Sequence, residues 1–237
     1  MSGTWSYEFR AGALAILPAA VAVVPFGLLL GARAVEVGLT PSEVLLMSAT
    51  VFAGSAQFVV IDLWTEPAPW AFIALTTLLV NVRHVLMGAS LAGKLGAFSP
   101  ALRPIAAFFM VDEVWAMAER RAMGSRLTRA YYAGLGGLLY ANWLVWTMTG
   151  ALFGKAIVNP EAYGFDFAFT AIFIGLLTGF WRGAPTAWVL AASAAAAVTV
   201  KYLVDGPWYI MAGGLAGVIM AMALWRPATD QEKAPAT

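Results

Sequence analysis

The sequence predicts an all-α fold, a polytopic bundle of seven to eight transmembrane helices. The first observation is composition: 61% of the 237 residues are apolar and 11% are charged, whereas soluble domains carry about 25% charged residues. The second is that the apolar residues form runs of about 20 residues, the length needed to cross a bilayer. These runs lack the strict alternation of membrane-spanning strands, so helices are the structure that satisfies their backbone in lipid.

Eight apolar segments are candidate spans, and Gly or Pro marks several of their junctions. They cover residues 11–34, 43–63, 69–93, 101–119, 130–157, 165–182, 184–204 and 207–226. Short connections separate the last three, so the count is seven or eight. We expect one transmembrane domain at 11–226, an N-terminal segment at 1–10 and a disordered polar tail at 227–237. The first run is too long for a signal peptide and contains Pro18 and Pro25, so we expect it to be retained.

The distribution of Lys and Arg predicts a cytoplasmic N-terminus, because cytoplasmic loops of membrane proteins are enriched in these residues. With eight spans, this orientation places eight Lys and Arg inside and five outside. Most of the difference comes from the cluster Arg120, Arg121, Arg126 and Arg129. We therefore expect a multi-pass protein of a cell membrane.

Several classes of protein are excluded or disfavoured. The chain has no Cys, which excludes a disulfide framework, a zinc–thiolate site and a cysteine nucleophile. The net charge of +1 gives no support for a nucleic-acid partner. Ser55 and His84 could form a hydrolase dyad, but Arg83 beside His84 is unsuited to a general base and no oxyanion site is evident. We expect no enzyme activity, no metal, no cofactor and no nucleic-acid partner.

An internal repeat has weak support. Two triplets of residues match at one constant offset: Pro67, Arg83 and Gly88 with Pro185, Lys201 and Gly206. A four-plus-four duplication in the same orientation accounts for them as a parallel repeat. Chance in a Gly- and Pro-rich apolar chain accounts for them at least as well.

The second apolar segment carries polar residues on two faces. Ser48, Ser55 and Asp62 recur every seven residues and share one face of a helix. Gln57 lies two residues beyond Ser55, about 200° around the helix axis. If both serve one site, the helix must break near Gly54, as spans of transporters do where backbone groups meet substrate. The alternative is that the small residues here let a neighbouring helix approach closely.

The third segment carries a wide polar stripe. One face holds Thr77, Asn81, His84 and Gly88, and the adjoining face holds Thr76, Arg83 and Ser90. His84, the single histidine of the chain, is either a structural residue or a proton carrier. Arg83 either binds a substrate carboxylate through a bidentate fork or forms an ion pair with a carboxylate of the fourth segment.

The fourth segment contains two adjacent carboxylates, Asp112 and Glu113. Their side chains diverge by about 100° on a helix, so they cannot both face one point. Two unpaired carboxylates at mid-membrane would be costly, so we expect one to be paired, with Arg83 as the partner, or protonated. The alternative is that the span begins late and both lie near the membrane interface.

Two segments carry a resemblance to a known family. Val51-Phe-Ala-Gly-Ser-Ala-Gln-Phe58 and Asn81-Val-Arg-His-Val-Leu-Met-Gly-Ala-Ser-Leu91 resemble signature segments of the AzlC family. Asp112-Glu113 and Asp166-Phe-Ala-Phe169 support the match, which runs from about residue 11 to 226. Val82 stands where Leu is more usual, a minor departure.

The resemblance implies a function as the large permease subunit of a two-component exporter. Such a protein would export branched-chain or other hydrophobic amino acids across the cytoplasmic membrane of a prokaryote. It would work with a small AzlD-type membrane subunit and would use the proton motive force. Two alternatives stay open: a passive channel for small solutes, and a scaffold subunit that is inactive alone.

This function needs partners for an ammonium group, for a carboxylate and for an aliphatic side chain. Ser55, Gln57 and Asn81, with backbone groups freed by the break at Gly54, could hold the zwitterion. Arg83 would bind the carboxylate, and His84, Asp112 and Glu113 would serve proton coupling or ion pairing. The substrate's side chain would contact apolar residues, namely Phe52, Phe58 and Met87.

Overall fold

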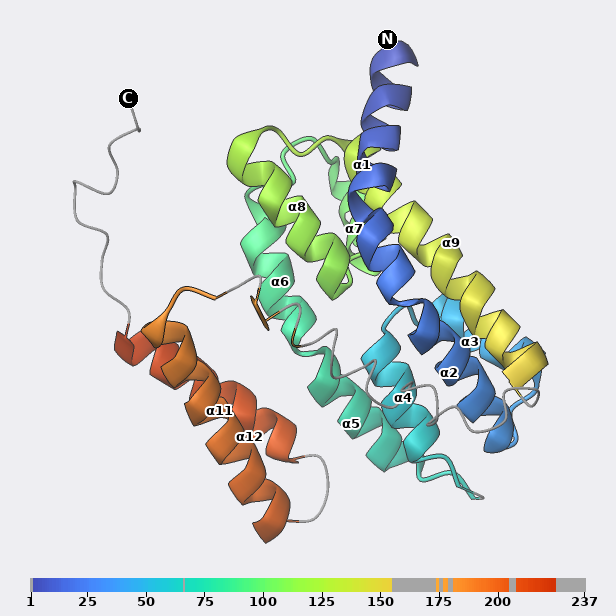
Figure 1. Cartoon of the computed structure of the whole chain (residues 1–237), viewed down its shortest axis with the longest axis vertical. Helices are drawn as coiled ribbons and strands as arrows, with labels where there is room; N and C mark the ends of the chain where they lie inside the picture. Colours follow the sequence, from blue (N-terminus) through green and yellow to red (C-terminus); the bar gives the residue numbers. More distant parts are fainter. Residues whose placement is uncertain are drawn as a thin grey trace. The chain divides into compact units, whose positions relative to one another are not determined.

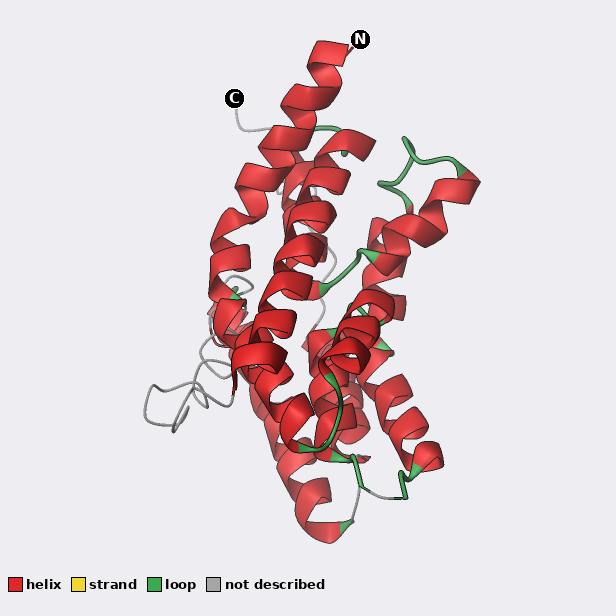
Figure 2. Cartoon of the chain, turned by 90° about the vertical axis from the view of Figure 1, so that its right-hand side faces the viewer, coloured by secondary structure: helices red, strands yellow, loops and turns green. Residues whose placement is uncertain are grey.

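The computed structural model describes residues 2–65, 67–154, 174, 177–178, 181–204 and 208–224. These residues form helices joined by turns and short irregular segments, with no strand among them (Figure 1 and Figure 2). The all-α prediction is therefore confirmed for the described part. The chain divides into two compact units, Met1–Ile172 and Phe173–Thr237.

The first apolar segment is a bent pair of helices. α1 (Ser2–Ala22) and α2 (Val24–Glu36) meet at Val23 with a bend of 53°. Pro25 has no N–H to donate to the preceding turn, which is a usual cause of such bends. The side chain of Asn142 donates to the Ala20 carbonyl at 2.9 Å, beside the bend. A polar side chain from another helix thus satisfies backbone that the bend exposes.

Helix α9 (Arg129–Phe153) is the scaffold on which the first unit is assembled. It runs beside α1 and α2 and also packs on α3 (Figure 1). Two glycines of α9 permit close approaches: a Cβ at Gly134 would collide with the Phe9 carbonyl oxygen, and one at Gly150 with the Leu28 carbonyl oxygen. Small residues that let backbones touch are the usual way that membrane helices pack tightly.

The second apolar segment is broken near Gly54, which is one of the two alternatives that the sequence leaves open. α3 (Pro41–Thr50) begins with a capping box, in which Thr40 and Glu43 satisfy each other's backbone N–H groups. Residues 51–53 are not helical, and α4 (Gly54–Asp62) begins directly after them. Gly54 has a structural reason to lack a side chain, because a Cβ there would lie 3.0 Å from the ring of Trp143 on α9.

The third segment is nearly continuous, whereas the fourth is not. α5 (Trp70–Asn81) and α6 (Arg83–Ala92) follow one line in Figure 1, with helical backbone at Val82, and together make an apolar span of 23 residues. The prediction of one continuous helix at 101–119 is wrong. A 3-10 turn (Pro100–Leu102) and α7 (Arg103–Phe108) end at residues 109–111, and α8 (Asp112–Gly124) starts afresh.

The second unit contains the helical hairpin α11 (Ala184–Leu203) and α12 (Trp208–Leu224). Its two helices pack on each other through small residues, with Gly213 set against Ser193 and Ala197. The predicted spans at 184–204 and 207–226 correspond to these helices. The predicted span at 165–182 and the tail at 227–237 lie almost wholly outside the described residues, as does Gly206 of the suggested repeat.

The number of spans is not confirmed. Two of the described helices are long and apolar enough to cross a membrane, Trp70–Ala92 and Ala184–Leu203. The bent pair α1–α2 makes a third if it counts as one span. Among the described helices, α3, α4, α7 and α8 are too short to cross singly, and α12 is a shorter apolar helix of 17 residues.

The glycine contacts give a test of the α9 scaffold. We expect Gly150→Ala to lower the free energy of unfolding by about 1–3 kcal/mol, because the added methyl must displace α2 backbone. Gly137→Ala is the matched control on the same helix, since a Cβ there meets nothing within 4 Å. Reversible unfolding in mixed micelles would measure both variants, and equal stability of the two would contradict this packing.

Candidate functional site

The centre of the candidate site is the guanidinium of Arg83, which joins three helices. One nitrogen, Nη2, donates to Ser55 Oγ at 2.6 Å. The other, Nη1, lies 2.8 Å from Asp112 Oδ2 in an ion pair. Ser55 is the second residue of α4, Arg83 the first of α6 and Asp112 the first of α8. The two breaks in the chain therefore present their helix starts to one arginine.

The electrostatics of this pair follow from its position. The side chains of Arg83 and Asp112 are 30% and 25% exposed, so both charges are largely removed from solvent. A lone charge at such a place would be costly, and pairing offsets that cost. Asp112 also lies in the first turn of α8, where the helix dipole favours a negative charge. Between the two expected roles of Arg83, the structure thus shows the ion pair with the fourth segment.

Three polar atoms of the third segment are buried without a hydrogen-bond partner. They are Arg83 Nε, Asn81 Oδ1 and Thr77 Oγ1. Thr77 and Asn81 are four residues apart on α5 and so share one face, directly before Arg83. Buried polar atoms in proteins almost always have partners. This donor and these two oxygens are therefore each available to a polar partner, with Thr77 and Asn81 on one face of the segment and Arg83 on the adjoining face.

The remaining candidates for proton coupling lie next to this cluster. The Nδ1 of His84 lies 3.2 Å from the backbone carbonyl of Asn81, and its ring is partly buried. Glu113 follows Asp112 in the first turn of α8 and is partly buried, but forms no ion pair with any described residue. The two adjacent carboxylates have different environments, as their divergence on a helix requires.

Gln57 lies away from Arg83, although it is only two residues from Ser55. Its side chain is fully buried, and its amide donates to Ser48 Oγ at 3.1 Å and accepts from Trp143 Nε1 at 2.9 Å. The break in the span does not turn Ser55 and Gln57 toward one cavity. It lets Ser55 face α6 while Gln57 connects α3, α4 and α9.

The two breaks also meet in an aromatic seam, which we define as Phe52, Phe108, Phe109 and Tyr140. Phe52 and Phe109 come from the two irregular segments, and their rings lie 5.2 and 5.4 Å from that of Tyr140. The Tyr140 hydroxyl donates to the Ala49 carbonyl at 2.8 Å, at the end of α3. The seam thus attaches both breaks to α9. Of the expected apolar pocket residues, Phe52 belongs to this seam and Met87 is buried at 7% exposure.

A second polar cluster sets the register of α6 against α8, which lie side by side (Figure 1). Trp115 Nε1 donates to Ser90 Oγ, and Ser90 Oγ donates to Glu119, each at 2.8 Å. Lys94 forms an ion pair with the same Glu119. Contacts at 83 with 112 and at 90 with 115 and 119 show that the helices run parallel. This register is what brings Asp112 to Arg83.

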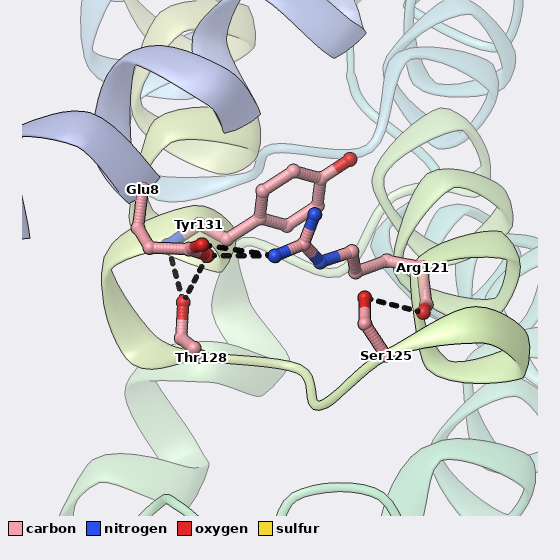
Figure 3. A network of polar contacts seen from close by, with 5 residues as sticks. All are labelled: Glu8, Arg121, Ser125, Thr128 and Tyr131. Carbon is pink, nitrogen blue, oxygen red and sulfur yellow. Dashed lines mark hydrogen bonds and ion pairs between the residues drawn. The ribbon is translucent and has the colours of Figure 1, made fainter. Parts of the chain in front are cut away.

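A third cluster fastens α8 to α1 and α9 at the other end of α8 (Figure 3). Arg121 Nη2 lies 2.9 and 3.0 Å from the two carboxylate oxygens of Glu8. Thr128, the N-cap of α9, donates to the same carboxylate at 2.9 Å, and the guanidinium lies 4.7 Å from the centre of the Tyr131 ring. Both ends of α8 are therefore held by an arginine–carboxylate pair.

Comparisons with known proteins identify relatives. The model of the family described as AzlC protein matches residues 18–157, more than half of the chain. The inner membrane protein YgaZ of Escherichia coli is 27% identical over 235 residues, which are 95% of each chain. An uncharacterized membrane protein of Archaeoglobus fulgidus is 29% identical over 174 residues, 73% of this chain and 75% of the relative.

A further relative has a functional name. The branched-chain amino acid transport protein AzlC of Bacillus subtilis is 26% identical over 183 residues, 76% of this chain and 70% of the relative. No solved structure matches the chain.

The Arg83–Asp112 pair can be tested by a double-mutant cycle on stability. We expect Arg83→Gln and Asp112→Asn each to destabilise the protein and the double variant to lose less than their sum. The coupling should be about 0.5–3 kcal/mol, because the two groups are in contact and poorly solvated. Unfolding in mixed micelles gives the four free energies.

The same cycle on Arg33 and Asp62 is the matched control. Their charged atoms are 4.0 Å apart and their side chains are 54% and 64% exposed, so solvent should leave little coupling. Coupling as small for Arg83 and Asp112 as for this control would contradict the buried pair.

Proposed function

The chain belongs to the AzlC family, and from this premise we propose that it exports branched-chain or other hydrophobic amino acids across the cytoplasmic membrane. It acts as the large subunit of a two-component exporter, with a small AzlD-type membrane subunit, and its transport is coupled to the proton motive force. The family is one of membrane transport, and the name of the Bacillus subtilis relative supports the substrate class.

The observation that carries the proposal is the set of buried polar atoms without partners at Arg83 and on the preceding turns of α5. An amino acid presents a carboxylate and an ammonium group close together. Arg83 Nε is a buried donor without a partner, and Asn81 Oδ1 and Thr77 Oγ1 are buried oxygens without partners. The substrate carboxylate binds the guanidinium edge, and the ammonium binds the oxygens of α5. Asp112 then holds Arg83 in place and balances its charge.

The broken helices contribute to the same site. The first N–H groups of a helix have no partner within it, and the dipole makes that end positive. α4 and α8 begin beside Arg83, at Gly54 and Asp112. Half-helices whose N-termini face an anionic group are a recurring way to bind substrates inside membranes. The arrangement favours a carboxylate-bearing substrate over a neutral solute.

Gln57 and Phe52 take positioning roles in this proposal. The Gln57 amide connects α3, α4 and α9 across the break, and Phe52 packs in the aromatic seam. They fix where Ser55 and Asp112 stand. The aliphatic part of the substrate is left to apolar side chains beside α6, and Met87 is a buried residue of that helix. Pockets of this kind distinguish one methylene by only about 1–3 kcal/mol, so several aliphatic amino acids serve as substrates.

We assign proton coupling to Glu113, with His84 as the alternative. Asp112 is committed to Arg83, whereas Glu113 has no ion pair among the described residues and can change protonation without breaking the site. One charge moved through 100 mV supplies about 2.3 kcal/mol. At 1.36 kcal/mol per tenfold change, this sustains a gradient of roughly fiftyfold, which suffices to export an excess amino acid.

The first test is valine efflux from proteoliposomes that contain the chain with its small subunit. We expect Arg83→Lys and Asn81→Ala each to lower the initial rate about tenfold or more, because Lys lacks the planar fork and Ala lacks the amide oxygen. Arg33→Lys is the control, since Arg33 lies in an exposed ion pair remote in sequence from the site. Normal efflux by both site variants would contradict the binding site.

The second test separates the two candidates for coupling. We expect Glu113→Gln to transport valine downhill but to lose its response to an imposed pH gradient. His84→Gln should keep that response. The reverse result would assign the proton to His84. Flux in the unaltered protein that ignores the gradient would instead indicate a passive channel.

A further inference from the structure

Two adjoining hollows lie beside the first turns of α1 and the start of α9, away from Arg83. One measures about 380 Å³ and the other about 250 Å³. Trp5 and Arg129 line both, so the hollows share a border. None of the residues that bind Arg83 lines either of them. This place therefore needs an explanation separate from the amino acid site.

The smaller hollow is an apolar groove between α9 and the segment that contains α7. Phe98, Ile105 and Tyr132 line it. The Tyr132 hydroxyl donates to the Ala106 carbonyl at 2.8 Å, so this polar atom is already satisfied. Gly137 also lines the groove, and a Cβ there would meet nothing within 4 Å. The groove has the chemistry of a site for a hydrocarbon chain.

The larger hollow is basic. Arg126 and Arg129 line it, both side chains are exposed, and neither forms an ion pair with a described residue. The acidic residue that lines it, Glu8, is already bound by Arg121 and Thr128 (Figure 3). Two uncompensated guanidinium groups thus stand at the mouth of an apolar groove. Trp5, which lines both hollows, is 51% exposed, and Trp is typical of the membrane interface.

We propose that these hollows together bind one anionic phospholipid, with its phosphate between Arg126 and Arg129 and an acyl chain in the groove. Basic pockets between membrane helices recognise lipid phosphates in this way. Inorganic phosphate shares the charge of the headgroup but has nothing to place in the groove. The apolar half of the site therefore favours a lipid as the occupant.

The groove adjoins the aromatic seam, which connects a lipid bound there with the transport site. Phe109 lines the groove and also belongs to the aromatic seam, where its ring lies 5.4 Å from that of Tyr140. It stands in the irregular segment that ends at Asp112. An acyl chain in the groove packs against the break that sets the start of α8.

The test uses tryptophan quenching by lipids with brominated acyl chains, in vesicles that contain the full chain. The signal of Trp5 is the difference between the unaltered protein and Trp5→Phe. We expect brominated phosphatidylglycerol to quench Trp5 at lower lipid fractions than brominated phosphatidylcholine. Arg126→Gln with Arg129→Gln should reduce this preference about twenty-five-fold, fivefold for each arginine.

The control for net charge is Arg120→Gln with Arg182→Gln, two exposed arginines that line neither hollow. It should keep the preference. Gly137→Leu should fill the groove and abolish quenching of Trp5 by phosphatidylglycerol, whereas Gly137→Ala should not.

Three results would overturn the proposal. The first is equal quenching by the two lipids. The second is an equal loss of preference in the Arg126/Arg129 variant and in the charge control. The third is a change in Trp5 fluorescence on addition of inorganic phosphate with no quenching by either brominated lipid, which would indicate an anion site alone.

Discussion

An arginine side chain inside an apolar bundle must keep a counter-charge within reach, and much of the first unit follows from that requirement. Arg83 finds its counter-charge in Asp112 and a further acceptor in Ser55. Neither partner would be there if α4 and α8 were continuous with the helices before them. The breaks at 51–53 and 109–111 place two helix starts beside one guanidinium. Pairing then makes a charge tolerable that would be costly alone.

The helices around the Arg83–Asp112 pair are held in place by close packing and by hydrogen bonds. α9 is an unbroken helix of 25 residues, and glycines bring α1 and α2 against its backbone. The aromatic seam and the Gln57–Trp143 hydrogen bond attach both breaks to α9. The clusters at Glu119 and at Arg121 fix α8 along its length. Short half-helices on a rigid scaffold are well suited to a site that must bind and release a polar molecule within a membrane.

The sequence predicts the chemistry of the site better than its geometry. The break near Gly54 is present, but the reason given for it from the sequence is wrong, because Ser55 and Gln57 do not serve one site. The pairing of Arg83 with the fourth segment is predictable from the cost of lone charges, although the residues alone leave a substrate carboxylate as an alternative. The direction of Gln57 is not predictable, since it depends on the angle at which α4 leaves the break.

Other features of the structure have no recognisable pattern in the sequence. The break at 109–111 contains no Gly or Pro, and its residues are as apolar as a helix interior. Tyr140 and Trp143 have the pattern of ordinary span residues, and their roles come from partners 91 and 86 positions away in the chain. The span count stays a prediction for a related reason: a window of apolar residues cannot tell a complete span from two half-helices.

The central claim is that Arg83 binds the carboxylate of a transported amino acid. Solid-state dipolar recoupling between the labelled carboxylate of valine and labelled arginine side chains tests it most directly, in vesicles containing both subunits. A short-range coupling that disappears in the Arg83→Lys variant is the expected result. Bound valine that shows no coupling to arginine, or the same coupling in that variant, would contradict the account.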